Sequence, residues 1–399
     1  MKKKLVQINT VCNGSVGRIM GQIQRTAMEQ GMDTLSIYGR RNGYGDMPCV
    51  KCGNGVSFWL HVALTTVTDR NGFGSYFVTK KMVRILRKEQ PDVIHLHNIH
   101  GYYLHIGVLF RYLKEEYKGK VIWSLHDCWS FTGHCPYYIL AKCDRWKASC
   151  YKCPNQRSYP ISFGLDQSKK NYRDKKELFT GITDLTLLVP SQWLMEQVEE
   201  SYLKEYPCKV IAHGIDVSIF HSGDKGFSHD SYGIARPSKI ILGVASIWEE
   251  RKGLRTFVEL AQSLPEQYQI VLVGVSSIQK QQLSSHGIIG ILRTEHMAEL
   301  VELYTAAHVF VNPSREETFS LVTLEALACG TPVIVTNDSA TKELVGECGI
   351  IVQGNEVTDY LAAIHDLEEQ YPSQDTMSKH VECYELEQQM NEVMKLYES

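Results

Sequence analysis

The sequence has no long apolar run. Its most membrane-like stretch, roughly Phe58 to Val67, contains His61 and Thr65 and is far shorter than the ~20 apolar residues that a spanning helix needs. The basic start, Met1–Lys4, is followed only by the short run Leu5–Ile8 before polar Asn9, too little for the core of a signal peptide. We therefore expect no membrane-spanning helix and no signal peptide, and a location in the cytoplasm.

The chain also lacks an excess of charge of either sign. Lys and Arg number 42 against 45 Asp and Glu, a net charge of −3, which disfavours a nucleic-acid-binding protein. Twelve cysteines in 399 residues are too few for a disulfide scaffold, and thiols are normally reduced in the cytoplasm. They are enough for a metal site.

What the sequence does have is an alternation of strand-like and helix-like segments, which is typical of βαβ units on parallel sheets. At 399 residues the chain exceeds the size of one hydrophobic core, and the pattern predicts two doubly wound α/β domains. The expected parts are an N-terminal domain at 1–219 with a cysteine-rich insertion at 128–157, an exposed connection at 220–237, a second domain at 238–380, and a C-terminal helix at 381–399. That helix either packs on its own domain or crosses back to the first.

The segment from Asn312 to Pro332 carries the most chemical information. Glu317 lies in a loop after a strand, and Glu325 follows eight residues later on a helix. The amides and dipole at the start of such a helix suit a diphosphate, and ionised carboxylates accept hydrogen bonds from sugar hydroxyls. From spacing alone, a helix with an ordinary acidic first turn explains the pattern equally well.

This segment resembles the E-x7-E region of the retaining glycosyltransferases of family 4. Further similarities follow in the same order along nearly the whole chain: the glycine loop Asn13–Arg18, Pro190-Ser191, His213–Asp216 for N-G-[IV]-D, and the donor-phosphate clamp Arg251-Lys252-Gly253. The segments His95–Tyr103 and Leu125–Cys135 are similar to the branch that builds bacterial capsular and exopolysaccharides.

The resemblance implies a GT-B fold, in which two Rossmann-like domains face each other across a cleft. It implies a retaining transfer from a nucleoside-diphosphate sugar, of UDP or GDP type, to a saccharide or lipid-linked saccharide acceptor. The chain contains no D-x-D, the acidic pair with which metal-dependent sugar transferases of the other main fold hold Mn²⁺ or Mg²⁺. We therefore expect no catalytic metal.

Roles follow residue by residue from the resemblance. The residues expected to act in catalysis are Lys252, which with Arg251 neutralises the leaving diphosphate, Glu317, which holds hydroxyls of the transferred sugar, and His126, which lies near its outer hydroxyls. Glu325 is expected to hold the ribose. The other expected donor-binding residues are Thr318, Phe319, Ser320, Leu321, Gly14 and Ser15, with Arg293 and Thr294 near the base. On the acceptor side we expect His97, Asn98 and Asp127.

The sequence departs from the family pattern at two positions. Ser246 stands where many members have an additional phosphate-binding arginine, and Ser320 stands where a glycine commonly follows the phenylalanine. Loss of the glycine narrows the backbone conformations that the loop can adopt.

Four cysteines lie within nineteen residues and end in C-x-x-C: Cys135, Cys143, Cys150 and Cys153. This spacing is compatible with one tetrahedral zinc site, and a segment with so little periodicity would benefit from a structural ion. Reduced thiols and disulfides are the alternatives. His95 and His97 share one face of a strand, but no carboxylate accompanies them, so hydrogen bonding is favoured over metal binding.

A basic helical stretch lies near Phe73, Tyr76 and Phe77, with the cations Lys80, Lys81, Arg84, Arg87 and Lys88. It is either a solvated face or a peripheral contact with an anionic membrane, which suits a lipid-linked acceptor.

Three other functions remain open at this stage. A sugar-nucleotide epimerase or a phosphorylase would use the same fold, and the cysteine segment suits a nucleotide-binding, zinc-stapled interaction protein. A nicotinamide dehydrogenase is disfavoured because Gly14-Ser15-Val16-Gly17 does not fit G-x-G-x-x-G.

Overall fold

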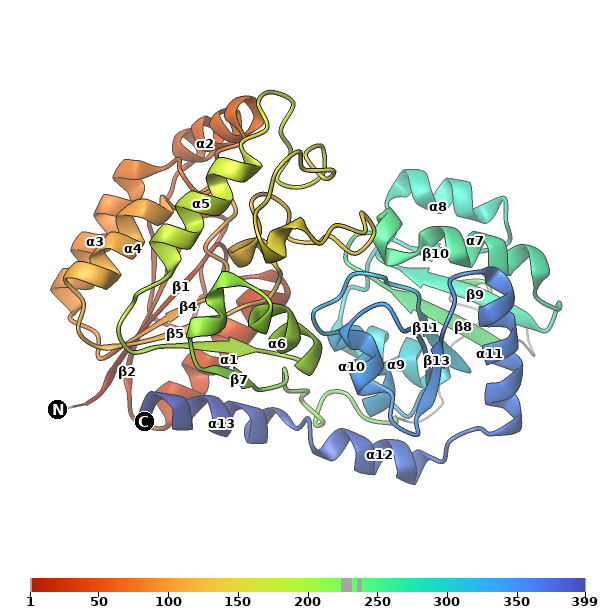
Figure 1. Ribbon diagram of the computed structural model, residues 1–399. Helices are drawn as coiled ribbons and strands as arrows, with labels where there is room; N and C mark the ends of the chain where they lie inside the picture. Colours follow the sequence, from red (N-terminus) through yellow and green to blue (C-terminus); the bar gives the residue numbers. More distant parts are fainter. Residues whose placement is uncertain (1, 224–231, 235–238, 399) are drawn as a thin grey trace. The chain divides into compact units, whose positions relative to one another are not determined.

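The computed structural model describes residues 2–223, 232–234 and 239–398. The chain forms two compact units (Figure 1). The N-terminal unit comprises Met1–Ala212 together with Met390–Ser399, and the C-terminal unit comprises His213–Gln389. Most of the connection expected at 220–237 lies outside the described residues.

The N-terminal unit is built on a seven-stranded parallel sheet in the order β3-β2-β1-β4-β5-β6-β7. The strands are β1 (Lys4–Asn9), β2 (Asp33–Tyr38), β3 (Cys49–Lys51), β4 (Val93–Leu96), β5 (Lys120–Ser124), β6 (Leu185–Val189) and β7 (Cys208–Val210). Its helices are α1 (Gly14–Glu29), α2 (Gly55–Thr68), α3 (Tyr76–Glu89), α4 (Ile106–Glu115), α5 (Ser168–Phe179) and α6 (Gln192–Glu199). Helices α3, α4 and α5 lie on one face of the sheet and α1 on the other (Figure 1), as right-handed crossovers require.

The C-terminal unit has a six-stranded parallel sheet in the order β10-β9-β8-β11-β12-β13. The strands are β8 (Lys239–Val244), β9 (Tyr268–Val273), β10 (Ile289–Ile291), β11 (Val309–Asn312), β12 (Val333–Thr336) and β13 (Gly349–Val352). The helices are α7 (Leu254–Ser263), α8 (Ser277–Ser284), α9 (Met297–Ala306), α10 (Leu321–Ala328), α11 (Val357–Glu369) and α12 (Gln374–Glu382). The two doubly wound parallel sheets confirm the predicted fold class.

Each sheet has one point at which the strand order reverses. The reversal lies between β1 and β4 in the N-terminal unit and between β8 and β11 in the C-terminal unit. The loops that follow these strands diverge to opposite faces, which leaves room for a ligand at the carboxyl ends of the strands.

Helix α1 begins at Gly14, because the glycine loop itself forms its first turn. A Cβ on Gly17 would lie 2.4 Å from the carbonyl carbon of Cys12. Only glycine therefore lets the helix start this close to the end of β1.

The C-terminal helix expected at 381–399 begins later in the structure, as α13 (Leu386–Glu398), because residues 381 and 382 are the end of α12. Between them, the amide of Ile215 donates to the carbonyl of Tyr384 at 2.8 Å, and the amide of Leu386 donates to the carbonyl of Ile215 at 2.9 Å. These two hydrogen bonds engage backbone groups of Tyr384 and Leu386 that would otherwise bond within a continuous helix, so the helix is interrupted here.

The last turns of α13 pack on the N-terminal unit. Tyr397 is buried there, and its hydroxyl lies 2.6 Å from Nδ1 of His95 on β4. Of the two arrangements considered for the C-terminal segment, the structure has the one that returns to the first unit.

Candidate functional site

The predicted donor-phosphate clamp lies at the strand reversal of the C-terminal unit. Arg251 and Lys252 belong to a short 3₁₀ turn that follows β8, and Glu317 lies in the loop that follows β11. Nζ of Lys252 forms an ion pair with the carboxylate of Glu317, and both side chains are mostly buried, at 18% and 12% exposure. The structure thus brings together two residues that are 65 positions apart in the sequence.

Backbone contacts hold these two loops in register. The amide of Arg315 donates to the carbonyl of Arg251 at 3.0 Å, and Nη1 of Arg251 donates to the carbonyl of Glu316 at 3.3 Å. Gly253 has a left-handed φ of +74°, and a Cβ there would lie 2.6 Å from Cγ of Pro313. A larger residue at 253 would push the loops apart.

Asn312, at the end of β11, organises the loop that carries Glu317. Its Nδ2 donates to Oγ of Ser320 and to Oγ1 of Thr323, both at 3.0 Å, and its Oδ1 accepts from the amide of Ser314 at 3.1 Å. The sequence shows only a polar residue at a strand end, so this role was not predicted.

Ser320 replaces the family's glycine without strain. Its φ of −139° is extended, a conformation open to any residue, and its Oγ accepts from the amide of Thr323 as the N-cap of α10. The amides from Thr318 to Leu321 therefore stand at a capped helix start, with Phe319 packed against His213 at a ring separation of 5.1 Å.

Glu325 is 3% exposed on α10. Its Oε2 accepts a hydrogen bond of 3.0 Å from the hydroxyl of Tyr304 on α9. Tyr304 is a second residue that the sequence analysis missed, because nothing in the motif points to a partner 21 positions earlier.

Two groups of expected donor residues belong to other elements than the clamp. Arg293 and Thr294 follow β10, which is the edge strand two positions from β8. Gly14 and Ser15 are exposed in the first turn of α1, in the N-terminal unit. Their part in donor binding stays a prediction.

In the N-terminal unit, three histidines form a stacked row. The rings of His95 on β4 and of His97, directly after this strand, are 4.3 Å apart, and those of His97 and His126 are 5.5 Å apart. Nδ1 of His97 lies 3.2 Å from Nε2 of His126, and its Nε2 lies 3.0 Å from Oε1 of Gln7. The row ends in the loop after β5, beside the strand reversal.

Asp127 follows His126 and is held by His100. Its Oδ2 lies 2.8 Å from Nε2 of His100, and its Oδ1 accepts from the amide of Trp129 at 2.9 Å. Burial raises the pKa of Asp127, but the charge of His100 and these hydrogen bonds outweigh burial and lower it overall. Asn98 lies nearby, and its carbonyl accepts from the hydroxyls of Thr10 and Tyr103 at 3.1 and 2.9 Å.

The four clustered cysteines line one enclosed space, together with Trp146 and Tyr138. The thiols of Cys135 and Cys153 hydrogen-bond to each other, and Sγ of Cys150 accepts from the amide of Gly133 at 3.1 Å. Among the described residues, no group of three or more His, Cys, Asp or Glu side chains is placed to hold a metal ion.

Interactions among side chains also hold the cysteine-rich segment, and the structural ion expected there stays a prediction. Trp146 is 1% exposed and packs against Tyr138, and His134 pairs with the fully buried Asp69. Lys175 on α5 is buried and donates to the carbonyls of Trp129 and Thr132 at 2.8 and 3.1 Å. Burial lowers the pKa of Lys175 to about 7.

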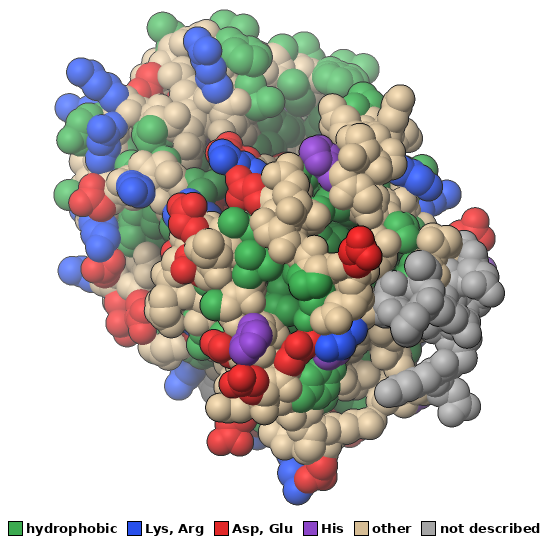
Figure 2. All heavy atoms as spheres, turned by 90° about the vertical axis from the view of Figure 1, so that its right-hand side faces the viewer, with side chains coloured by type: hydrophobic (Ala, Val, Ile, Leu, Met, Phe, Trp, Pro, Cys, Tyr) green, Lys and Arg blue, Asp and Glu red, His purple; other side chains and the backbone are tan. Residues whose placement is uncertain are grey.

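Surface charge is mixed, as the composition predicts. Figure 2 shows acidic and basic side chains interspersed over one face of the molecule. The basic stretch expected on α3 is exposed at Lys80, Lys81, Arg84, Arg87 and Lys88. Arg87 forms an ion pair with Glu116 at 2.8 Å.

Two family models match the chain, one to each unit. The model described as Glycosyltransferase Family 4 matches residues 59–219, and the model described as Glycosyl transferases group 1 matches residues 238–370. Together these ranges cover well over half of the sequence.

A curated relative, the putative colanic acid biosynthesis glycosyl transferase WcaC of Escherichia coli K12, is 25% identical over 362 residues, which cover 86% of each protein. Among solved structures, sucrose-phosphate synthase from Thermosynechococcus elongatus superposes with a TM-score of 0.73 at 17% identity, covering 100% of this chain and 98% of the other. The Anabaena protein Alr3699/HepE, solved with UDP and glucose, has a TM-score of 0.66 at 15% identity and 98% coverage of both chains.

The fold, the clamp and these matches define a glycosyltransferase of the GT-B fold. More particularly, the chain belongs to glycosyltransferase family 4.

Proposed function

We propose that this glycosyltransferase transfers a sugar from a UDP- or GDP-type donor to a saccharide acceptor, with retention of configuration and without a catalytic metal. The ion pair of Lys252 and Glu317 at the strand reversal is the observation that carries the proposal. The names of two similar proteins, one of colanic acid biosynthesis and one solved with UDP and glucose, support a role in making a surface polysaccharide such as a capsule.

The main chemical task is to stabilise the diphosphate as it leaves. Lys252 and Arg251 supply positive charge, and the amides from Thr318 to Leu321 supply donors at the start of α10. Fixed donors and cations in a mostly buried site stabilise developing negative charge without having to reorganise. In the free protein Glu317 holds the ammonium of Lys252 at this place.

The remaining contacts orient the donor and the acceptor. Glu317 and His126 hold hydroxyls of the transferred sugar, Glu325 holds the ribose, and Arg293 and Thr294 lie near the base. The acceptor hydroxyl attacks from the face that the diphosphate leaves, so no protein nucleophile is needed. His97, Asn98 and Asp127 orient the acceptor.

Two matched pairs of variants test these roles. Lys252→Ala is expected to lower kcat by about 10²–10³, whereas Lys280→Ala, an exposed lysine of α8, leaves it unchanged. Glu325→Gln is expected to weaken nucleotide binding by about 10-fold, whereas Glu302→Gln on α9 does not. Wild-type turnover or affinity in Lys252→Ala and Glu325→Gln would contradict the assignments.

A thermal-shift panel of UDP and GDP sugars identifies the donor, because a ligand that binds only the folded state raises the melting temperature. Incubation of the donor with and without acceptor then separates the activities. A transferase forms glycosylated product only with acceptor, whereas an epimerase converts the donor alone and a phosphorylase needs phosphate.

A lipid-linked acceptor would place the enzyme at the cytoplasmic face of a membrane. The exposed cations of α3 support this, because each Lys or Arg near an anionic surface contributes about 1 kcal/mol to binding.

A structural zinc ion at Cys135, Cys143, Cys150 and Cys153 is also proposed. The four cysteines line one space, which supports the proposal. Zinc binding would require the four sulfur atoms to move into a tetrahedral arrangement.

A further inference from the structure

Helix α2 has an inverted distribution of side chains. The residues that it turns toward the protein are polar, since His61 and Thr65 are buried at 1% and 0% exposure. Its outward stripe is apolar: Val56, Trp59, Leu60, Ala63, Leu64 and Val67, with Trp59 and Leu60 each 67% exposed and Val56 71%. The spacing of three and four residues puts these side chains on one helical face, and the helix contains no charged residue.

The fold fixes this orientation. Nε2 of His61 accepts from the amides of Gly72 and Gly74 at 3.2 and 3.3 Å, and its Nδ1 lies 2.9 Å from Oγ of Ser75. A Cβ on Gly74 would lie 2.5 Å from the imidazole. The inward histidine therefore locks the apolar stripe to the outside.

Neighbouring segments extend the apolar stripe into a patch. The amides of Phe163 and Leu165 donate to the carbonyls of Thr66 and Val67 at 2.9 and 3.2 Å, and their side chains are 71% and 60% exposed. Phe77, at the start of α3 beside Ser75, is 83% exposed. Large exposed apolar patches mark interaction sites.

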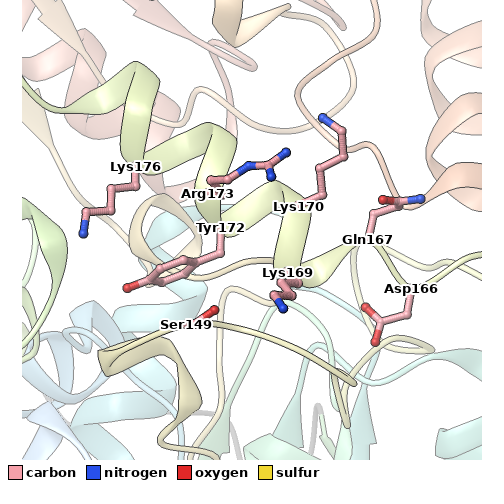
Figure 3. Close-up of a pocket in the computed structure, with 8 residues that line it drawn as sticks. All are labelled: Ser149, Asp166, Gln167, Lys169, Lys170, Tyr172, Arg173 and Lys176. Atoms are coloured by element: carbon pink, nitrogen blue, oxygen red, sulfur yellow. The ribbon is translucent and has the colours of Figure 1, made fainter.

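Exposed cations lie on α3 and α5, the helices next to this patch, and they outnumber the exposed acids. Helix α3 presents Lys80, Lys81 and Arg84 to solvent, with no acid before Glu89. Helix α5 begins directly after the loop of Phe163 and presents Lys169, Lys170, Arg173 and Lys176 along an open groove (Figure 3).

Most acids of this region are engaged within the protein, although Asp166 and Glu177 are exposed. Asp69, at the end of α2, is fully buried, and Asp174 on α5 takes Nη2 of Arg70 at 2.7 Å. Asp166 accepts from the amides of Cys153 and Ser168 at 3.0 and 2.8 Å. The exposed charge beside the apolar patch is therefore predominantly positive.

We propose that α2 lies in the interface of an anionic lipid bilayer, with its apolar stripe, Phe77, Phe163 and Leu165 at the boundary of head groups and acyl chains. The cations of α3 and α5 then contact lipid phosphates. At 14 residues and 1.5 Å per residue the helix is about 21 Å long, too short to cross the ~30 Å hydrocarbon layer. No described helix is long and apolar enough to span a bilayer. The charge complementarity selects an anionic membrane over a second copy of the chain.

This inference rests on the membrane location in the proposed function, and it names the element that enters the lipid. Trp59 gives a direct signal, because the other five tryptophans of the chain, all described, are buried or partly buried. Addition of vesicles containing about 30% phosphatidylglycerol is expected to shift its emission to shorter wavelength, and brominated lipid is expected to quench it. Trp59→Phe should bind vesicles without this change.

Flotation with the same vesicles measures affinity. The double variant Leu60→Ser and Phe163→Ser is expected to lose about 10-fold or more, whereas the matched control Ile278→Ser, which alters a 70% exposed side chain of α8, binds as wild type does. Lys80→Glu with Lys81→Glu should weaken binding and abolish the preference over phosphatidylcholine vesicles.

The outcomes separate the inference from the proposed transferase activity, which is assayed with a water-soluble acceptor in the absence of lipid. Unchanged Trp59 emission with vesicles, or unchanged flotation of the double variant, overturns the inference while transfer persists. A lipid-free dimer that buries Trp59 and persists with vesicles overturns it in favour of a second copy. If the wild-type protein shows no transfer in the lipid-free assay, the proposed transferase activity is wrong, whereas the inference about α2 is unaffected.

Discussion

The buried His95 is expected to make the N-terminal unit sensitive to mild acid. His95 is 0% exposed, and its two ring nitrogens lie 2.6 Å from the hydroxyl of Tyr397 and 2.7 Å from Oγ of Ser124. Burial, with a smaller effect of His126, lowers its pKa from 6.5 to about 3. His95 is therefore neutral in the folded unit at every pH at which the unit is stable.

The sign of the effect follows from proton binding. Below pH 6.5 the unfolded chain binds a proton at His95 that the folded unit does not, so the free energy of unfolding falls as the pH falls from 6.5 toward 3. At pH 5 the difference is about 1.5 pH units, or about 2 kcal/mol at 1.36 kcal/mol per unit.

His95→Asn removes the titrating group, so comparison with wild type gives the contribution of His95 to the pH dependence of the free energy of unfolding. The variant is destabilised at pH 7.5 because it loses packing, but the difference from wild type should shrink by about 2 kcal/mol between pH 7.5 and pH 5. Urea unfolding followed by tryptophan fluorescence at each pH measures this difference, with constant m values required. A difference that stays the same at both values of pH would refute the argument that His95 is buried neutral.

Two further predictions concern the site and the cysteines. Tyr304→Phe removes only the hydroxyl that donates to Glu325 and is expected to weaken nucleotide binding by about 5- to 30-fold with little change in kcat. Calorimetry measures the affinity and steady-state kinetics measure kcat. An unchanged affinity would mean that Tyr304 does not position Glu325. Metal analysis of the purified protein is expected to find one zinc per chain. The double variant Cys143→Ser and Cys150→Ser is expected to lose this zinc. A wild-type protein without zinc would show that the four thiols do not bind this metal.

The strands could be predicted because parallel strands covered on both faces are continuous apolar runs. Helix α10 is marked by local signals in the sequence, the capping Ser320 before it and Gly330 after it. The break between α12 and α13 was not predictable, because it depends on pairing with Ile215, some 170 residues earlier. Local sequence patterns predict helices and strands, but they do not show which backbone groups form hydrogen bonds with a segment far away in the sequence.

The same limit applies to α2. Its apolar stretch was visible in the sequence, but the sequence alone does not tell which face of an apolar helix is buried. The answer depends on His61, which finds three partners between Gly72 and Ser75. A polar residue satisfied by backbone groups thus outweighs the apolar stripe in deciding what turns inward.

The positions of Lys252 and Glu317 were predictable because they lie in the loops after the first and fourth strands of the C-terminal sheet, at the edge where sheets of this kind bind ligands. The residues that make the loops rigid were not. Asn312 joins Ser314, Ser320 and Thr323, and each of these contacts is ordinary in type. Only their convergence on one side chain shows that the loop carrying Glu317 is fixed before any donor binds. Preorganised charge of this kind stabilises a developing negative charge, so we expect Asn312 to act on the proposed transfer through the position of Glu317 rather than by contact.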